Sequence, residues 1–332
     1  MTDALAPLHA AALRRRHLLA LAAGGLALPA ARAASYPDRP IKLVVGYPPG
    51  GSVDATARQL ADVLGPKLKA SIVIDNQGGA AGALGAQRVA TSAADGYTLL
   101  LGSSNELAAT GVLNRAQKYD PMKDFTPIGL VSSAPVLLVA GPKAGFKTLA
   151  EMVDGVKRNP GKYSYGSSGV GSTLHFAGEL MKQRAGLFMT HIPYRGVAPL
   201  TNDLAGGAIE LAMLSVPGAQ PFLQSGRLTA LGVTGGQRLK ALPQVPALAE
   251  HPLLKGYEMS GWFALVGPKG LPADVSGRLQ AALHESLADP VLRQRMEDTG
   301  AYPAGPRDDL AKLMREDIAR FAKLADYAHM RE

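Results

Sequence analysis

One stretch decides the fold of this chain: Ile41-Lys-Leu-Val-Val-Gly-Tyr-Pro-Pro-Gly-Gly-Ser-Val-Asp54. It begins as an apolar run typical of a β-strand, breaks into a turn of proline and glycine, and opens a helix near Ser52. Such a turn leaves backbone N–H groups unpaired, and the helix adds the positive end of its dipole at the same place. The junction is therefore suited to holding an anion. A second junction of this kind follows at Tyr163-Ser-Tyr-Gly-Ser-Ser-Gly-Val-Gly-Ser-Thr-Leu-His175, and two such turns facing each other indicate a cleft.

The chain on either side of the first turn alternates strands and helices. Apolar runs predict strands at 41–47, 71–74 and 97–101, and helical spacing predicts helices over 55–68 and through 89–90. Three βα units in a row predict a parallel sheet with right-handed crossovers. Because open sheets of this kind bind ligands beyond the carboxyl ends of their strands, the turns at 48–54, 76–82 and 102–105 lie where a ligand would sit.

The pattern continues into a second domain. Residues 119–127 are interpreted as an irregular connector, and the strand expected at 136–140 crosses to that domain. Ser172 is the expected N-cap of a helix. The chain returns to the first domain along 260–267. Further strands are predicted at 128–131, from 191, at 209–215 and at 228–234, and further helices at 149–157, around Asp203, and at 272–288, 290–299 and 308–328.

The N-terminus is that of an exported protein. Three arginines at 14–16 precede the apolar run 17–28, and Ala31 and Ala33 fit a cleavage site. The run is shorter than the roughly 20 residues that a spanning helix needs, so residues 1–33 are predicted to be a signal peptide that is removed, leaving a periplasmic protein that does not span the membrane. The pair Arg15-Arg16 also resembles a twin-arginine signal, which leaves the export route open.

Composition limits the class of protein. The 332 residues are enough for roughly two domains of about 150 residues. The chain has no cysteine, which excludes disulfides and thiolate chemistry. The predicted signal peptide carries four arginines and one aspartate, so its removal lowers the formal charge from +8 to +5. The mature chain has no long basic run and few aromatic residues, so no nucleic-acid partner is expected, although a mild positive field could steer small anions inward.

Enzyme signatures fail in this sequence. Gly166-Ser-Ser-Gly-Val170 has valine where a nucleophile elbow needs glycine, and the first turn lacks the lysine of a P-loop. The mature histidines, at 175, 191, 251, 284 and 329, show no metal spacing. We therefore expect a binding protein without catalysis, metal or cofactor. A ligand sensor that docks on a signalling partner remains an alternative, and a periplasmic hydrolase a weaker one.

An ordered set of motifs runs along the chain: Tyr36-Pro-Asp-Arg-Pro-Ile41, Pro48-Pro-Gly-Gly-Ser-Val-Asp54, Asp95-Gly-Tyr-Thr-Leu99, Tyr119-Asp-Pro121, Asp124-Phe-Thr-Pro-Ile128, Asn159-Pro-Gly-Lys162, Tyr165-Gly-Ser-Ser-Gly-Val-Gly-Ser172 with His175, and His191-Ile-Pro-Tyr-Arg-Gly-Val-Ala-Pro199. In this order the motifs resemble a known family, the Bug (TctC-like) periplasmic solute-binding proteins of tripartite tricarboxylate transporters. The resemblance spans about 36–328. It implies an α/β Venus-flytrap fold with two crossing segments, a first domain of 36–138 and 262–332, and a second domain of 139–261.

The resemblance also implies a ligand site. Two loops, residues 48–54 and 167–172, are implied to grip a carboxylate, largely through backbone N–H groups and ordered water, and the remaining residues complete the pocket. The implied ligand-binding residues are Tyr47, Pro49, Gly50, Gly51, Ser52, Asp54, Ser103, Ser104, Asn105, Ser167, Ser168, Gly169, Val170, Gly171, Ser172, His175, Tyr194, Gly196, Ala198 and Asp203. Where relatives often have Pro-Gly-Ala-Gly-Gly after the second strand, this chain has Gln77-Gly-Gly-Ala-Ala-Gly82.

The sequence leaves several roles and partners open. Arg195 either forms a bidentate contact with the ligand or is solvated, Asp203 either faces the ligand or caps backbone, and His175 either packs or touches the ligand. The expected ligand is a small aliphatic or aromatic carboxylate, and the expected partner is a permease of the tripartite tricarboxylate type. We expect the receptor itself to be a monomer.

Overall fold

The computed structural model describes residues 36–114 and 117–330, so the predicted signal peptide lies outside the described residues. The described helices and strands belong to one compact unit that begins at Arg39. Within the described ranges, no helix is both long and apolar enough to cross a membrane.

The first lobe is built on three parallel strands. β1 (Ile41–Val45) lies between β2 (Ile72–Asn76) and β3 (Thr98–Ser103), and the pairing is parallel, as the βα pattern predicts. Helices α2 (Ser52–Leu68) and α3 (Ala83–Ala90) connect these strands. The helix α2 forms because Leu60, Leu64 and Leu68 recur on one face, and that face is buried. The ends of β1 and β3 therefore open at the same edge of the sheet.

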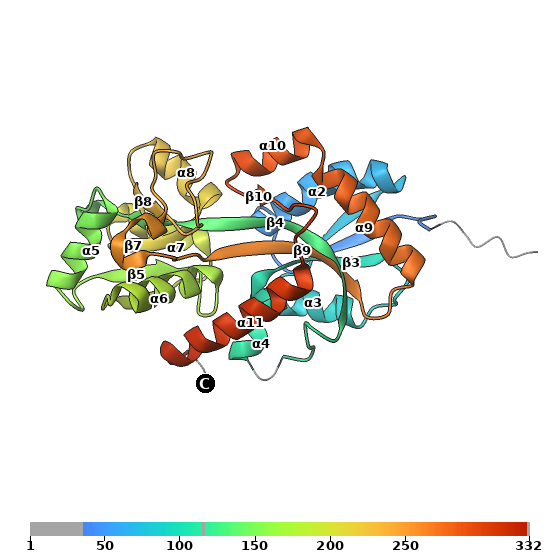
Figure 1. The fold of residues 1–332 in the computed structure, drawn as a ribbon, viewed down its shortest axis with the longest axis horizontal. Helices are drawn as coiled ribbons and strands as arrows, with labels where there is room; N and C mark the ends of the chain where they lie inside the picture. The colour runs from blue at the N-terminus through green and yellow to red at the C-terminus, as the bar shows by residue number, and fades with distance from the viewer. Residues whose placement is uncertain (1–35, 115–116, 331–332) are drawn as a thin grey trace, which may run out of the picture. The chain divides into compact units, whose positions relative to one another are not determined.

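One long strand, β4 (Phe125–Ala140), joins this lobe to the second. Its first part pairs antiparallel with β9 (Ser260–Pro268), and residues 136–140 pair with strands of the second lobe (Figure 1). The predicted strands 128–131 and 136–140 both lie in β4, and the predicted crossing at 136–140 is confirmed. The irregular connector ends at 124 and not at 127, and the predicted break between the two strands was wrong. Pro127 and Pro135 indicated breaks, but the strand absorbs shifts in register at 127/129 and 130/132 while its pairing with β9 continues.

The second lobe repeats the parallel arrangement. β5 (Ser164–Ser167) lies between β6 (Thr190–Pro193) and β7 (Leu211–Ser215), while β8 (Thr229–Val233) pairs antiparallel with β4. Its helices are α5 (Leu149–Arg158), α6 (Thr173–Ala185), α7 (Val197–Gly206) and α8 (Val216–Gln224). The sequence reasoning missed α8, because Pro217 and Pro221 mark a turn in sequence terms. Pro217 instead occupies the first turn of the helix, where its missing N–H is not needed.

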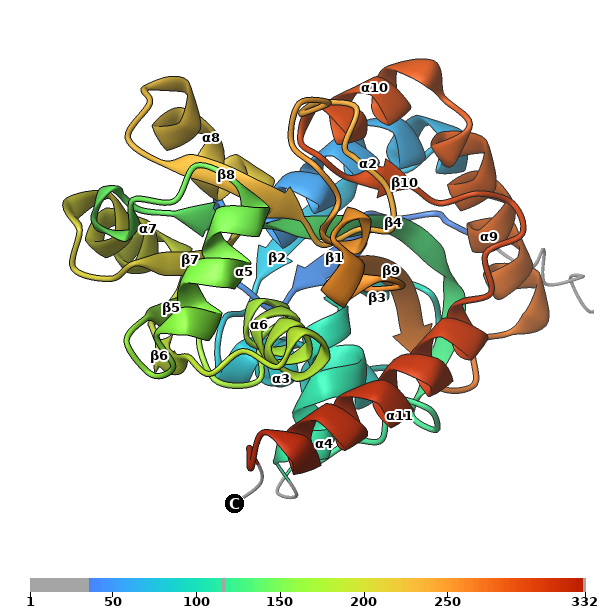
Figure 2. The same cartoon turned by 60° about the vertical axis from the view of Figure 1, so that its left-hand side comes forward.

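The C-terminal segment packs on the first lobe, and its last helix also contacts the second lobe. It comprises α9 (Ala273–Leu287), α10 (Pro290–Asp298), β10 (Tyr302–Pro303) and α11 (Leu310–Tyr327). Helix α11 contacts α6, the short helix α4 (Thr110–Leu113) and a π-helical turn, Asn105–Ala109 (Figure 2). The rings of Phe176 on α6 and Phe321 on α11 stack with centroids 4.5 Å apart, and one apolar core includes residues of both lobes. The crossing strands and α11 together fix the described arrangement of the lobes.

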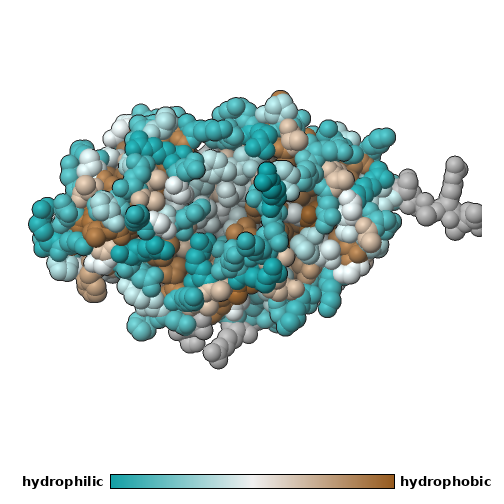
Figure 3. All heavy atoms as spheres, in the orientation of Figure 1, coloured by the Kyte–Doolittle hydropathy of each residue, from teal (hydrophilic) through white to brown (hydrophobic). Residues whose placement is uncertain are grey.

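The face drawn in Figure 3 is mainly hydrophilic. Apolar residues appear on it in small separate groups. A broad apolar patch, which would mark a large protein interface, is not seen on that face.

Candidate functional site

The first loop connects β1 to α2, and the buried carboxylate of Asp54 holds it in place. Asp54 is only 3 % exposed, and its carboxylate accepts hydrogen bonds from the Gly50 N–H (2.9 Å), from Arg58 Nε (3.0 Å) and Nη2 (2.9 Å), and from Asn76 Nδ2 (3.0 Å). Burial alone would raise the pKa of Asp54, but these hydrogen bonds outweigh it and lower the pKa. Gly50 has φ +88°, a conformation that favours glycine. Asp54 therefore shapes the loop from inside.

The same loop presents a helix N-terminus without a side-chain cap. The N-cap of α2 is Gly51, which has no side chain to bond the first-turn N–H groups. The preceding residues at 48–50 are exposed, and Ser52 is half-buried. Backbone donors and the positive end of the helix dipole are thus available at the carboxyl end of β1.

A polar cluster follows β3 beside this loop. Tyr47 Oη lies 2.8 Å from Glu106 Oε2, 2.9 Å from the Ala81 carbonyl oxygen and 3.2 Å from Ser103 Oγ. Asn105 Nδ2 donates to Tyr47 Oη at 3.2 Å. Burial raises the pKa of Glu106 to about 7, and burial together with the Glu106 charge raises the pKa of Tyr47. The predicted residues Tyr47, Ser103 and Asn105 therefore come together around an acid that the sequence reasoning did not select.

The two lobes meet at Asn105. Its Oδ1 accepts hydrogen bonds from the backbone N–H (3.2 Å) and the hydroxyl (3.1 Å) of Thr173, the first residue of α6. Ser104 Oγ lies 3.1 Å from the same hydroxyl. These contacts place the predicted turn 103–105 of the first lobe against the start of α6, next to the second loop. Within the described residues, Asn105 thus connects Tyr47 of the first loop to Thr173, which directly follows the second loop.

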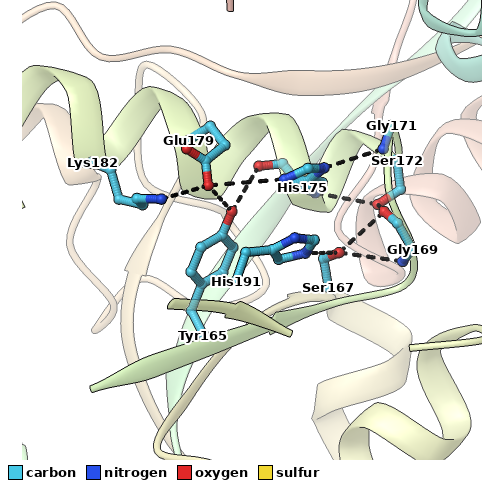
Figure 4. A network of polar contacts seen from close by, with 9 residues as sticks. All are labelled: Tyr165, Ser167, Gly169, Gly171, Ser172, His175, Glu179, Lys182 and His191. Carbon is cyan, nitrogen blue, oxygen red and sulfur yellow. Dashed lines mark hydrogen bonds and ion pairs between the residues drawn. The ribbon is translucent and has the colours of Figure 1, made fainter. Parts of the chain in front are cut away.

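The second loop, residues 167–172, is held by its own hydrogen bonds (Figure 4). Ser172 caps α6, as predicted, by accepting the His175 N–H at 3.2 Å. The Gly169 N–H donates to Ser167 Oγ (3.2 Å), and the Gly171 N–H donates to His175 Nδ1 (3.2 Å). Ser168 and Gly169 are half-buried, and Val170 is 58 % exposed. The Ser172 N–H also donates to the Gly169 carbonyl (3.2 Å), so three backbone donors of this loop are already used inside the protein.

A histidine pair lies beneath the second loop. The rings of His175 and His191 stack with centroids 3.7 Å apart and planes 10° from parallel, and His191 Nε2 lies 2.7 Å from Ser167 Oγ (Figure 4). Burial, followed by the charge of Lys182, lowers the pKa of His175 to about 4. Burial and the neighbouring His175 lower the pKa of His191 to about 3. Both rings are therefore neutral at pH 7, and His175 holds backbone of the loop.

The remaining predicted residues lie at the start of α7. The Gly196 N–H donates to the Ser168 carbonyl at 3.2 Å, which places this segment beside the second loop. Tyr194 Oη donates to Asp203 Oδ2 at 2.9 Å, so the Asp203 side chain orients Tyr194. Ala198, Arg195 and Asp203 are exposed.

Three residues of this junction escaped prediction as site residues: Glu106, Thr173 and His191. Thr173 could have been found, because it directly follows the expected N-cap. Glu106 could not, because an acid in a helical turn is ordinarily a solvated surface residue. Within the described ranges, no group of three histidine, aspartate or glutamate side chains is placed to hold a metal ion.

Comparison with known proteins identifies the family. The model of the tripartite tricarboxylate transporter family receptor matches residues 56–328. This chain belongs to that family. The receptor is 34 % identical over 307 residues to Protein BugT of Bordetella pertussis, with 91 % of this chain and 93 % of BugT covered.

Two solved structures resemble the receptor closely. The periplasmic binding protein BugD has a TM-score of 0.78 and 32 % identity, covering 89 % of this chain and 99 % of BugD. Rpa4515 of R. palustris with adipate has a TM-score of 0.81 and 33 % identity, covering 89 % and 98 %. The predicted α/β two-domain periplasmic-binding-protein fold and the family are thus confirmed. The chain is a periplasmic solute-binding receptor, the class to which its family and its structural neighbours belong.

Proposed function

We propose that this receptor binds a small carboxylate between its two lobes and delivers it to a permease of the tripartite tricarboxylate type. The lobes correspond to residues 36–138 with 262–332, and to residues 139–261. The observation that carries the proposal is the uncapped N-terminus of α2, which an exposed loop presents beside Tyr47 and Asn105. The adipate in the structure of Rpa4515 supports the same ligand class.

The energies are sufficient for such a ligand. A charge-assisted hydrogen bond to a carboxylate contributes about 1.5–3 kcal/mol, and a helix N-terminus adds about 0.5–2 kcal/mol in a partly buried site. A few such contacts reach the roughly 8 kcal/mol of micromolar binding. No arginine is needed for this, which agrees with the exposed position of Arg195.

The residues divide into direct contacts and supports. In this proposal the N–H groups at the start of α2, with Ser52, Tyr47 and Asn105, contact the ligand. Asp54 and His175 act through the backbone of the two loops that they hold. Because Asn105 joins the lobes through Thr173, the ligand enters when these hydrogen bonds open, and the lobes close again on the bound acid.

Thermal-shift screening of residues 34–332 tests the function. The panel holds adipate, malate, citrate, benzoate and aspartate, each beside a neutral amide of the same skeleton. We expect at least one carboxylate to raise the melting temperature while its amide does not. Stabilisation by the amides alone would contradict the proposal.

A substitution at the start of α2 tests the role of the backbone donor. Ser52→Pro removes one N–H at the first helical position, where proline is well tolerated and where the extended Gly51 suits a following proline. Loss of one charge-assisted bond predicts about 10- to 150-fold weaker binding. Ser52→Ala separates the effect of the hydroxyl. Ala273→Pro, at the first position of α9, is the matched control and should bind as the wild type does.

A further inference from the structure

A buried acid stands behind the proposed ligand site. Glu106 is fully buried in the π-helical turn that follows β3. Its Oε1 accepts the Ser103 N–H at 2.6 Å, and its Oε2 contacts both Ser103 Oγ and Tyr47 Oη. Tyr47, Ser103 and the adjacent Asn105 are residues that the proposed function places against the ligand. The carboxyl group of Glu106 is thus hydrogen-bonded to residues that lie against the carboxylate ligand in the proposed site.

Counting hydrogens shows which form of this carboxyl fits the cluster. Tyr47 Oη lies at hydrogen-bond distance from two acceptors, Glu106 Oε2 (2.8 Å) and the Ala81 carbonyl oxygen (2.9 Å), but a phenol has only one hydrogen. If Glu106 is ionised, one of these contacts brings two oxygens together without a proton between them. If Glu106 is protonated, it donates to Tyr47 and the Tyr47 hydroxyl donates to Ala81. Ser103 then donates to Glu106, and only the longest contact of the cluster, between Tyr47 Oη and Ser103 Oγ (3.2 Å), lacks a hydrogen, whereas the ionised form leaves two contacts without one.

The charges around Glu106 do not favour its ionised form. Among the described residues, a second titratable group that contacts Glu106, besides Tyr47, is Tyr119, whose hydroxyl donates to the Glu106 backbone carbonyl at 2.8 Å. The elements packed on the turn carry Arg88 on α3 and several charged residues on α11. On α11, Asp317 is buried and Arg320 is half-buried, whereas Lys312, Arg315, Glu316, Lys323 and Asp326 are exposed to solvent. Arg88 pairs with Asp75, and Arg320 pairs with Asp317, so both of these arginines are engaged elsewhere. Burial therefore dominates, and burial disfavours a charge.

From this geometry we infer that Glu106 holds a proton in the binding-competent site, and that carboxylate binding is coupled to uptake of that proton. The inference rests on the proposed function, because the coupling requires the ligand charge to lie near Tyr47 and Ser103. A second negative charge there makes ionisation of Glu106 still less favourable. The protonated acid lets an anion approach a site that would otherwise contain a like charge.

The coupling has a definite sign. The pKa of Glu106 in the free protein is raised to about 7, so at pH 6 the carboxyl is largely protonated before and after binding, and little proton is taken up. At pH 8 the free protein is largely ionised, and a ligand that raises the pKa further draws in up to one proton per site. The affinity then falls by up to about tenfold per pH unit above neutrality, until the pKa of the complex is reached.

Calorimetry measures this directly. Adipate and malate are titrated into residues 34–332 at pH 6 and pH 8, in buffers with different ionisation enthalpies, and the dependence of the heat on the buffer gives the number of protons taken up. We expect a value near zero at pH 6 and approaching one at pH 8. In Glu106→Gln, which keeps a neutral group at this position, the uptake disappears and the affinity no longer falls with pH.

Two controls keep the outcomes apart. Glu210→Gln removes a partly buried acid of the second lobe that pairs with Lys143, and it should keep the proton uptake of the wild type. An infrared difference spectrum of ligand-free wild type against Glu106→Gln should show a protonated-carboxyl band at pH 6. Binding without proton uptake at pH 8, or absence of that band, would overturn the inference alone. Failure of every carboxylate to bind while the band is present would count against the proposed function and the coupling, but not against the protonated acid.

Discussion

Replacing Asp54 with asparagine tests how the first loop is held. Asp54 Oδ2 accepts the Gly50 N–H and Arg58 Nε, and Oδ1 accepts Arg58 Nη2 and Asn76 Nδ2. Asparagine must turn an amide NH₂ toward one of these donor pairs, so two hydrogen bonds are lost and donor faces donor. The other two bonds lose the help of the charge.

The magnitude follows from the buried contacts. The hydrogen bond from Gly50 to a charged acceptor contributes about 1.5–3 kcal/mol, and the mismatch at the opposing donor brings the total loss to about 2–4 kcal/mol. The Arg58 side chain is 54 % exposed, so solvent screening makes its ion pair with Asp54 only a small part of this loss of stability. Without its hydrogen bond to residue 54, Gly50 allows the loop to adopt more conformations. Adipate should therefore bind more weakly.

Urea unfolding across pH checks the cause. The folded-state pKa of Asp54 is lowered from its ordinary value of 3.8, so its stabilisation is complete above that value and is lost as the pH falls through the folded-state pKa. The stability gap between wild type and Asp54→Asn should therefore be constant from pH 5 to pH 7 and close in strong acid. Equal urea midpoints at pH 7, or a gap that persists unchanged in strong acid, would refute the reasoning.

Three further predictions concern the supports around the site. Phe321→Ala should lower the free energy of unfolding by about 3–5 kcal/mol in urea, because it empties the stack that α11 makes with the second lobe; a loss below about 1 kcal/mol would contradict that role. The pKa of His191 is lowered to about 3, so its contribution to stability is complete above the ordinary value of 6.5 and is lost as the pH falls below that value. In thermal melts between pH 6 and pH 4, His191→Phe should therefore lose about 1–2 kcal/mol less free energy of unfolding than the wild type. An equal loss in both proteins would argue against this contribution. Gly82→Ala should cost more than about 2 kcal/mol, since φ is +92° and a Cβ would lie 2.7 Å from Glu106 Oε2; near-native urea stability would show that this cluster is loose.

The sequence was sufficient for the parallel cores of the lobes and for the two loops. Both follow from local patterns: apolar runs of strand length, helical spacing in α2, and turns of glycine and proline at strand ends. The N-cap Ser172 was equally readable, since its hydroxyl needs only the backbone three residues on. The long strand β4 and helix α8 were not, because tertiary pairing and packing outweighed their prolines.

The contacts between the lobes lay beyond sequence reasoning. Asn105 and Thr173 are 68 residues apart, and no local periodicity relates them. The burial of Glu106 depends on Tyr47, Ser103 and α11 folding over it, so an acid that looks solvated in the sequence becomes the one with a pKa near 7. The positions of the loops could be predicted, but the groups that hold and tune them could not.

The most direct measurement of the central claim is a crystal structure of residues 34–332 with the carboxylate that gives the largest thermal shift. We predict one ligand carboxylate within hydrogen-bond distance of the backbone N–H groups at the start of α2, with Tyr47 and Asn105 beside it and Asp54 still bonded to Gly50. A ligand bound elsewhere, for example against the depression that Gln280, His284 and Arg293 line beside β4, would contradict the account.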